Sequence, residues 1–132
     1  MQLQTIARNA AANALADLCD VGSTNSTARI IIYTSGKTTT LAEVLCNNPA
    51  FGAAANGVVT LDVSPDVQDT AANATGTAAL YDLVDRDNNI IISGNVGTTG
   101  TDLIVANTSF QENVPIRITS LIYTVPAGSL GP

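Results

Sequence analysis

The chain has 132 residues, no His, few aromatic residues (4%) and a net charge of −6. This length suits a single domain with one core. Without His, Ser-His-Asp and Cys-His catalytic arrangements and His-based metal sites are excluded, and the five singly spread basic residues form no patch for nucleic acid.

Residues 5–18 are predicted to form a helix. Apolar residues recur at spacings of three and four, a pattern typical of one helix face; they are Leu3, Ile6, Ala10, Ala14 and Leu18. Ala favours helix, and Asp20 and Gly22 stand where the helix should end. The stripe is narrow, and it packs either on its own domain or on a neighbouring surface.

Beyond Gly22, short β-like runs alternate with small polar residues. The runs cover residues 29–33, 39–45, 58–63, 77–84, 90–92, 102–106 and 113–125. Their spacing predicts a mainly β protein, a β-sandwich or a jelly-roll-like fold, with one short N-terminal helix. We expect a helical segment at 1–22, a β-sandwich domain at 23–126 and a flexible tail at 127–132.

Few residues are suited to catalysis or metal binding. Asp85, Asp87 and Asn89 resemble the start of a calcium loop, but Ile90 stands where an EF-hand requires Gly. A hairpin turn is therefore favoured there, with a bound cation as the alternative. The glycines at 94, 97 and 100 predict a tight turn or bulge and do not match a phosphate-binding loop. We expect no catalytic residue, no cofactor and no metal.

Cys19 and Cys46 are the only cysteines. They are predicted to be free or buried thiols, with a disulfide between them as the alternative. The chain has no run of about 18 apolar residues, and its first 20 residues lack the apolar core of a secretory signal. We therefore expect no membrane partner, and the sequons at Asn25, Asn73 and Asn107 are interpreted as turn residues.

Three stretches, in a fixed order, carry a resemblance to a known family. The first joins residues 7–18 to 28–36, the second is 76–82 with the acidic turn after it, and the third comprises 92–97, 100–103 and 114–124. In this order they resemble small virion structural proteins of tailed bacteriophages and prophages. Two departures affect the turn geometry: Ala79-Leu80 replaces an aromatic residue and an Arg, and Asn88-Asn89 stands where relatives often have Gly.

The resemblance implies a virion component. The first expectation is a capsid decoration or cement protein that binds the outside of the shell, with the major capsid protein as its partner. The alternative is a tail, head-fibre or receptor-binding component, and a cellular adhesin or pilus-like subunit is a third reading. Capsid decoration is an analogy from the family and does not follow from individual residues.

Partner contacts are expected at both ends of the chain. Leu3, Ile6 and Ala10 are the predicted partner-binding residues, because a segment at the chain start can reach a neighbouring surface. The run at 113–125 carries apolar residues on both faces, which predicts a homo-oligomer, a dimer or a trimer.

Overall fold

The computed structural model describes residues 1–128. Helix α1 (Thr5–Cys19) comes first, and a short 3-10 helix, η1 (Ser35–Lys37), follows the first strand. The strands within these residues are β1 (Arg29–Tyr33), β2 (Thr40–Leu45), β3 (Val58–Thr60), β4 (Gln68–Asp69), β5 (Gly76–Thr77), β6 (Leu80–Val84), β7 (Ile90–Gly97), β8 (Leu103–Val105), β9 (Ser109–Phe110) and β10 (Ile116–Thr124).

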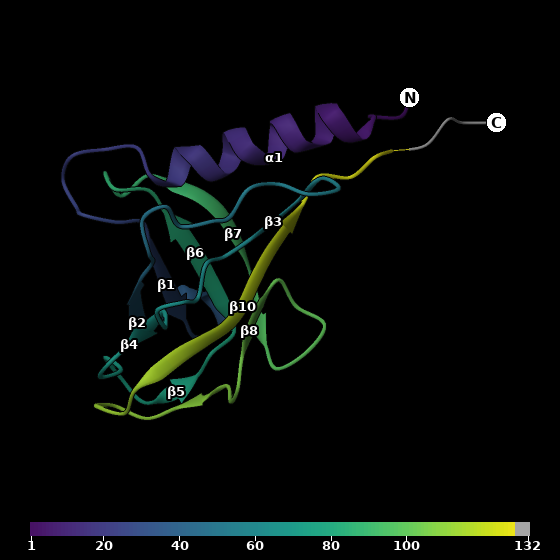
Figure 1. The fold of residues 1–132 in the computed structure, drawn as a ribbon. Coiled ribbons are helices and arrows are strands. Elements are labelled where there is room, and N and C mark those ends of the chain that lie inside the picture. The colour runs from purple at the N-terminus through teal and green to yellow at the C-terminus, as the bar shows by residue number, and fades with distance from the viewer. Residues whose placement is uncertain (129–132) are drawn as a thin grey trace.

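Eight of these strands form one mixed, strongly curled sheet (Figure 1). Its order is β2-β1-β6-β7-β8-β10-β3, with β4 paired to β10, while β5 and β9 form a small separate sheet. The mainly β class with one N-terminal helix is confirmed. The finer prediction of a β-sandwich or jelly roll is corrected: the strands follow one continuous path of pairing, so they curl into a half-barrel and do not stack as two sheets.

Segment 69–73 connects the two sides of the curl. The Glu43 N–H on the outer edge of β2 donates to Asp69 Oδ2 at 3.0 Å, and the Asn73 N–H donates to the Leu41 carbonyl at 2.7 Å. The same Asp69 pairs with Ile116 of β10. Backbone groups on the β2 edge are therefore bonded within the chain, which protects an edge that could otherwise pair with another chain.

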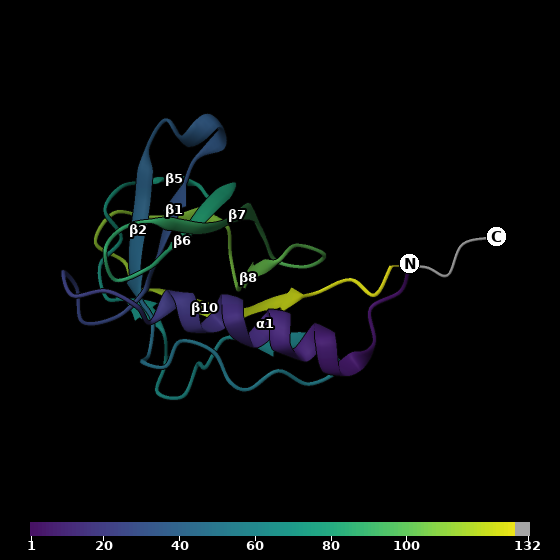
Figure 2. The ribbon, with the colours of Figure 1, turned by 90° about the horizontal axis from the view of Figure 1, so that it is seen from above.

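Helix α1 lies across one end of the curled sheet, as the view from above shows (Figure 2). It contacts β3 and β7, and its buried residues are Ala12, Ala16 and Cys19. The chain ends meet beside it: the Leu3 N–H donates to the Ala127 carbonyl at 2.7 Å, and Gln2 pairs with Gly128. Of the tail predicted at 127–132, residues 129–132 lie outside the described residues.

Strand β10 turns one face inward along its whole length. Ile116 and Ile118 are buried in its first half, and Leu121 and Val125 are buried in its second half and just beyond it. A register shift between Ile118 and Ser120 changes the inward positions from even to odd residues. Most of the apolar residues of β10 thus point inward, and of its large apolar side chains Ile122 is the one that is 45% exposed. The second face is only weakly apolar, and the homo-oligomer stays a prediction.

The acidic hairpin turn is confirmed, whereas the glycine prediction needs correction. The Asn88 N–H donates to the Asp85 carbonyl, and Asn88 has the positive φ of 69° that such a turn requires. Gly94 and Gly97 lie inside strand β7, away from its register shift opposite Leu83 and Val84, so they form neither a tight turn nor a bulge. Gly100, at φ 72°, lies in the bend that follows the strand. Gly94 faces Tyr81 across the β6–β7 pair.

Candidate functional site

The three predicted partner-binding residues are exposed near the start of the chain: Ile6 and Ala10 lie on α1, and Leu3 precedes the helix. Ile6 is 83% exposed, Leu3 is 40% exposed, and Ala10 is also exposed. Ala14 and Leu18 continue the same stripe outward along the helix. We call this surface, formed by Leu3, Ile6, Ala10, Ala14 and Leu18, the outer stripe. Asp17 is the only exposed charged side chain in the helix, so the stripe is apolar and almost uncharged.

Hydrogen bonds from one flank of α1, between its buried side and the outer stripe, fix its rotation. Asn9 Oδ1 accepts from the Gly57 N–H at 2.7 Å, and Asn13 Oδ1 accepts from the Ala54 N–H at 2.8 Å. Just past the helix, Asp20 Oδ1 accepts from the Ala50 N–H at 3.1 Å. Residues 9 and 13 are four apart and share a face. They attach the helix to segment 50–57, and the outer stripe then points away from the domain.

Small residues make the close contact beneath the helix. Ala12 and Ala16 are buried against the sheet with Cys19, and an Ala side chain allows a close approach of helix and sheet. Of the two sequence alternatives, the helix does pack on its own domain, but through these residues and not through the outer stripe. The sequence signal that could have identified the packing side is the pair Asn9 and Asn13, polar residues placed to bond neighbouring backbone.

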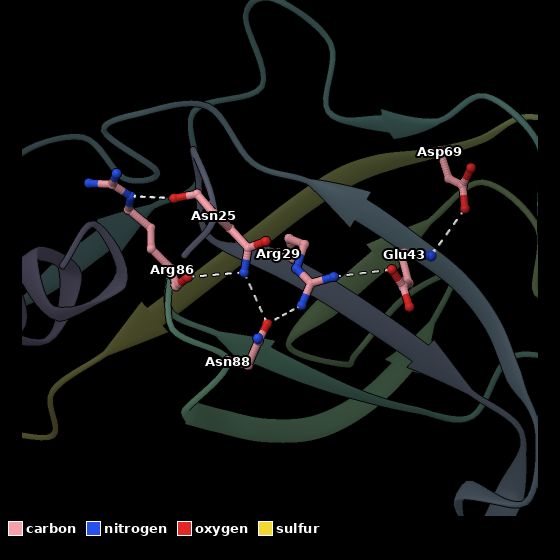
Figure 3. A network of polar contacts seen from close by, with 6 residues as sticks. All are labelled: Asn25, Arg29, Glu43, Asp69, Arg86 and Asn88. Carbon is pink, nitrogen blue, oxygen red and sulfur yellow. Dashed lines mark hydrogen bonds and ion pairs between the residues drawn. The ribbon is translucent and has the colours of Figure 1, made fainter. Parts of the chain in front are cut away.

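A network of polar side chains lies on the outer surface around β1 and β2 (Figure 3). Its members are Asn25, Arg29, Glu43, Asp69, Arg86 and Asn88. Arg29 donates to Glu43 Oε2 at 3.1 Å and also to the Asn88 side chain. The Arg86 Nε–H donates to the Asn25 carbonyl at 2.8 Å. The network connects the β6–β7 turn to the segment that leaves α1, which is a structural role.

The acidic turn uses its carboxylates internally. Asp85 Oδ1 accepts from the N–H groups of Asp87 and Asn89, and Asp87 Oδ1 accepts from those of Ser23 and Thr24. Burial of the Asp85 carboxyl opposes ionisation, but these bonds outweigh it and lower the pKa of that group. Residues 1–128 contain no group of three or more metal-ligating His, Cys, Asp or Glu side chains. Both oxygens of Asp85 and one oxygen of Asp87, which the alternative cation site would use, thus already accept hydrogen bonds within the chain.

A second buried carboxylate is paired with a lysine. Lys37 Nζ donates to both oxygens of Asp82 at 2.7 and 3.0 Å, and the Ser93 hydroxyl donates to the same group. Burial raises the cost of this charge, yet the bonds from Lys37 and Ser93 lower the pKa of Asp82 below its ordinary value. Asp82 and Ser93 are paired residues of β6 and β7, and Lys37 comes from η1, so the cluster ties η1 to the sheet.

The two cysteines are free and buried. Burial, followed by the nearby negative charge of Asp20, raises the pKa of Cys19 to about 12; burial raises that of Cys46 to about 12. Such thiols are poor nucleophiles and metal ligands. The prediction of free, buried thiols is confirmed over the disulfide alternative.

Comparison with protein-family models, curated proteins and solved structures gives no match for this chain. Among residues 1–128, no helix has the length and apolar character required to cross a membrane. The functional argument therefore depends on the surfaces of the molecule itself.

Proposed function

We propose that this protein is a bacteriophage capsid decoration protein that binds the outside of the shell through the outer stripe of α1. The single observation that supports the proposal most is the exposure of Ile6 and Ala10 on one apolar face of α1, with Leu3 exposed just before the helix. The sequence resemblance supplies the shell, and hence the major capsid protein, as the partner.

Each stripe contact is small. Full burial of a large aliphatic side chain such as Ile6 or Leu18 contributes about 1.5–3 kcal/mol, so one helix face binds weakly. A shell offers many identical sites, and a homo-oligomer that engages several of them gains through a high effective concentration. Binding to the assembled shell but not to separated subunits then stabilises the shell by mass action.

The helix is already held on its domain, which favours binding. The Asn9 and Asn13 bonds present the stripe in a fixed orientation, so little conformational freedom is lost when it meets a flat surface. Because the stripe has almost no charge, the net charge of −6 repels an acidic shell less at this face than elsewhere.

Co-sedimentation with undecorated shells from the phage or prophage that encodes the chain tests the proposal. Ile6→Asp places a charge in the stripe and should reduce shell binding at least tenfold. Ile90→Asp is the matched control, because Ile90 is also exposed (58%) but lies on β7; it should bind like the wild type. Both variants should keep the wild-type circular dichroism spectrum. Equal binding by both, or binding of the wild type to tails alone, would refute the proposal.

A further inference from the structure

Strand β8 is too short to fill its place in the sheet. It spans only Leu103–Val105 and pairs with β7 at Val96 and Gly97 alone. Residues 90–95 of β7 therefore pair with β6 on one side, and within residues 1–128 no strand pairs with their other side. In the same way, residues 122–124 of β10 pair with β3 only. The edges of β7 and β10 therefore face each other across a gap, at the place in the sheet that a longer β8 would occupy.

A slot of about 340 Å³ occupies this position. It is lined by Tyr81, Ile92, Ser93, Asp102 and the consecutive residues 121–124. Neighbouring residues of a strand point to opposite faces, so a cavity lined by consecutive residues is bounded by the strand edges themselves. None of the lining residues belongs to α1, so the slot is separate from the outer stripe, and the inference below is independent of the proposed function.

The slot has an acidic side with no counter-ion. Neither the Asp102 carboxylate nor the Tyr81 hydroxyl bonds to another residue of the described chain. The Asp102 carboxylate and the Tyr81 hydroxyl both lie next to Gly94. A Cβ atom added at Gly94 would be 2.9 Å from Asp102 Oδ2 and 3.1 Å from the Tyr81 hydroxyl oxygen. Burial and then the charge of Asp102 raise the pKa of Tyr81 to about 12. A carboxylate beside Tyr81, in a slot that Tyr123 also lines, is suited to an ammonium or guanidinium group.

A second copy of the chain has no free basic side chain for this place. All five are engaged: Arg8 with the Val125 carbonyl, Arg29 with Glu43, Lys37 with Asp82, Arg86 with the Asn25 carbonyl, and Arg117 with Asp66. A basic group that complements Asp102 without breaking one of these contacts comes from a different protein.

We propose that the slot between β7 and β10 receives an extended segment of a different protein as an added strand, with a Lys or Arg side chain against Asp102. The backbone of the segment pairs with the edges at residues 90–95 and 122–124, which supplies affinity. The basic side chain supplies selectivity, because an acidic or neutral residue at that position leaves Asp102 unpaired.

Peptide titrations followed by amide NMR test this proposal. The probes are two capped pentapeptides, Thr-Val-Lys-Val-Thr and Thr-Val-Glu-Val-Thr. We expect the first to shift the amide signals of residues 90–95 and 122–124 and to bind about fivefold more tightly than the second at low salt. Asp102→Asn should reduce that ratio to about one, whereas Asp17→Asn, which removes one exposed charge on α1, should leave it unchanged.

Three results would overturn the proposal. They are equal affinity for the two peptides, shifts confined to other residues, and an unchanged ratio in Asp102→Asn. Concentration-dependent self-association of the wild type that Asp102→Asn abolishes would also overturn it, because the occupant would then be a second copy. Asp102 is exposed, so its substitution should leave folding intact, and circular dichroism checks this.

Discussion

Asn13 Oδ1 accepts a hydrogen bond from the Ala54 N–H at 2.8 Å, across 41 residues of sequence. Together with the buried Ala12, Ala16 and Cys19, this bond and its neighbour from Asn9 fix the rotation of α1 on the domain. The outer stripe is exposed for that reason.

Removing the Asn13 acceptor should destabilise the fold. Asn13→Ala leaves the Ala54 N–H without its partner at a partly buried position, and we expect a loss of about 1–2 kcal/mol in the free energy of unfolding. Asn13→Asp keeps an acceptor oxygen, so its free energy of unfolding should be closer to that of the wild type. Urea unfolding of the three proteins measures the difference, and equal destabilisation by both substitutions would contradict this role.

Acid should weaken the protein through Asp82. The folded state lowers the pKa of this group, so its contribution to stability is complete above its unfolded pKa of about 4. That contribution is lost as the pH falls through the lower folded value. Asp82→Asn should cost about 2 kcal/mol at pH 7, since Lys37 loses its charged partner. Between pH 7 and pH 2.5, the free energy of unfolding measured with urea should therefore fall less for the variant than for the wild type. If the two proteins lose the same free energy over this range, Asp82 is not the cause.

The cysteines should react only after unfolding. Both thiols are buried, with pKa values of about 12, so almost no thiolate is present at pH 8. A chromogenic disulfide reagent should therefore detect almost no thiol in the native protein and both in guanidinium chloride. Fast labelling of the native protein at pH 8 would contradict the buried placement.

Ala substitutions at two glycines should have very different effects on the free energy of unfolding. An added Cβ at Gly94 would lie 2.9 Å from Cε1 of the buried Tyr81 ring, so Gly94→Ala should cost about 1–3 kcal/mol. Gly52 is the control: its nearest neighbour, the Thr60 carbonyl oxygen, is 4.0 Å away, and Gly52→Ala should stay within about 0.5 kcal/mol of the wild type. Thermal unfolding of both variants makes the comparison, and similar melting temperatures would refute the close Tyr81–Gly94 contact.

Local patterns were sufficient for several elements. The α1 helix, strand β3 within the predicted run at 58–63, and the acidic hairpin turn depend on residues near each other in sequence, and local patterns predict each of them. Periodicity and turn chemistry act over a few residues, so the sequence itself contains these signals.

Long-range pairing accounts for the elements that were missed. Strand β4 is two residues outside every predicted strand run, and it forms because Gln68 and Asp69 pair with β10. The register shift in β10 follows from its pairing with β8, and no local pattern marks it. The same limit applied to the candidate site: the stripe was recognisable in the sequence, but its outward direction depends on bonds from Asn9 and Asn13 to residues more than 40 positions away.

The central claim is that the outer stripe of α1 faces a shell, and cryo-electron microscopy of the particle that contains this chain tests it most directly. The account predicts density for the protein on the outer capsid surface, with Leu3, Ile6 and Ala10 in contact with the major capsid protein. Density at the tail only, or on the capsid with the outer stripe pointing to solvent, would contradict it.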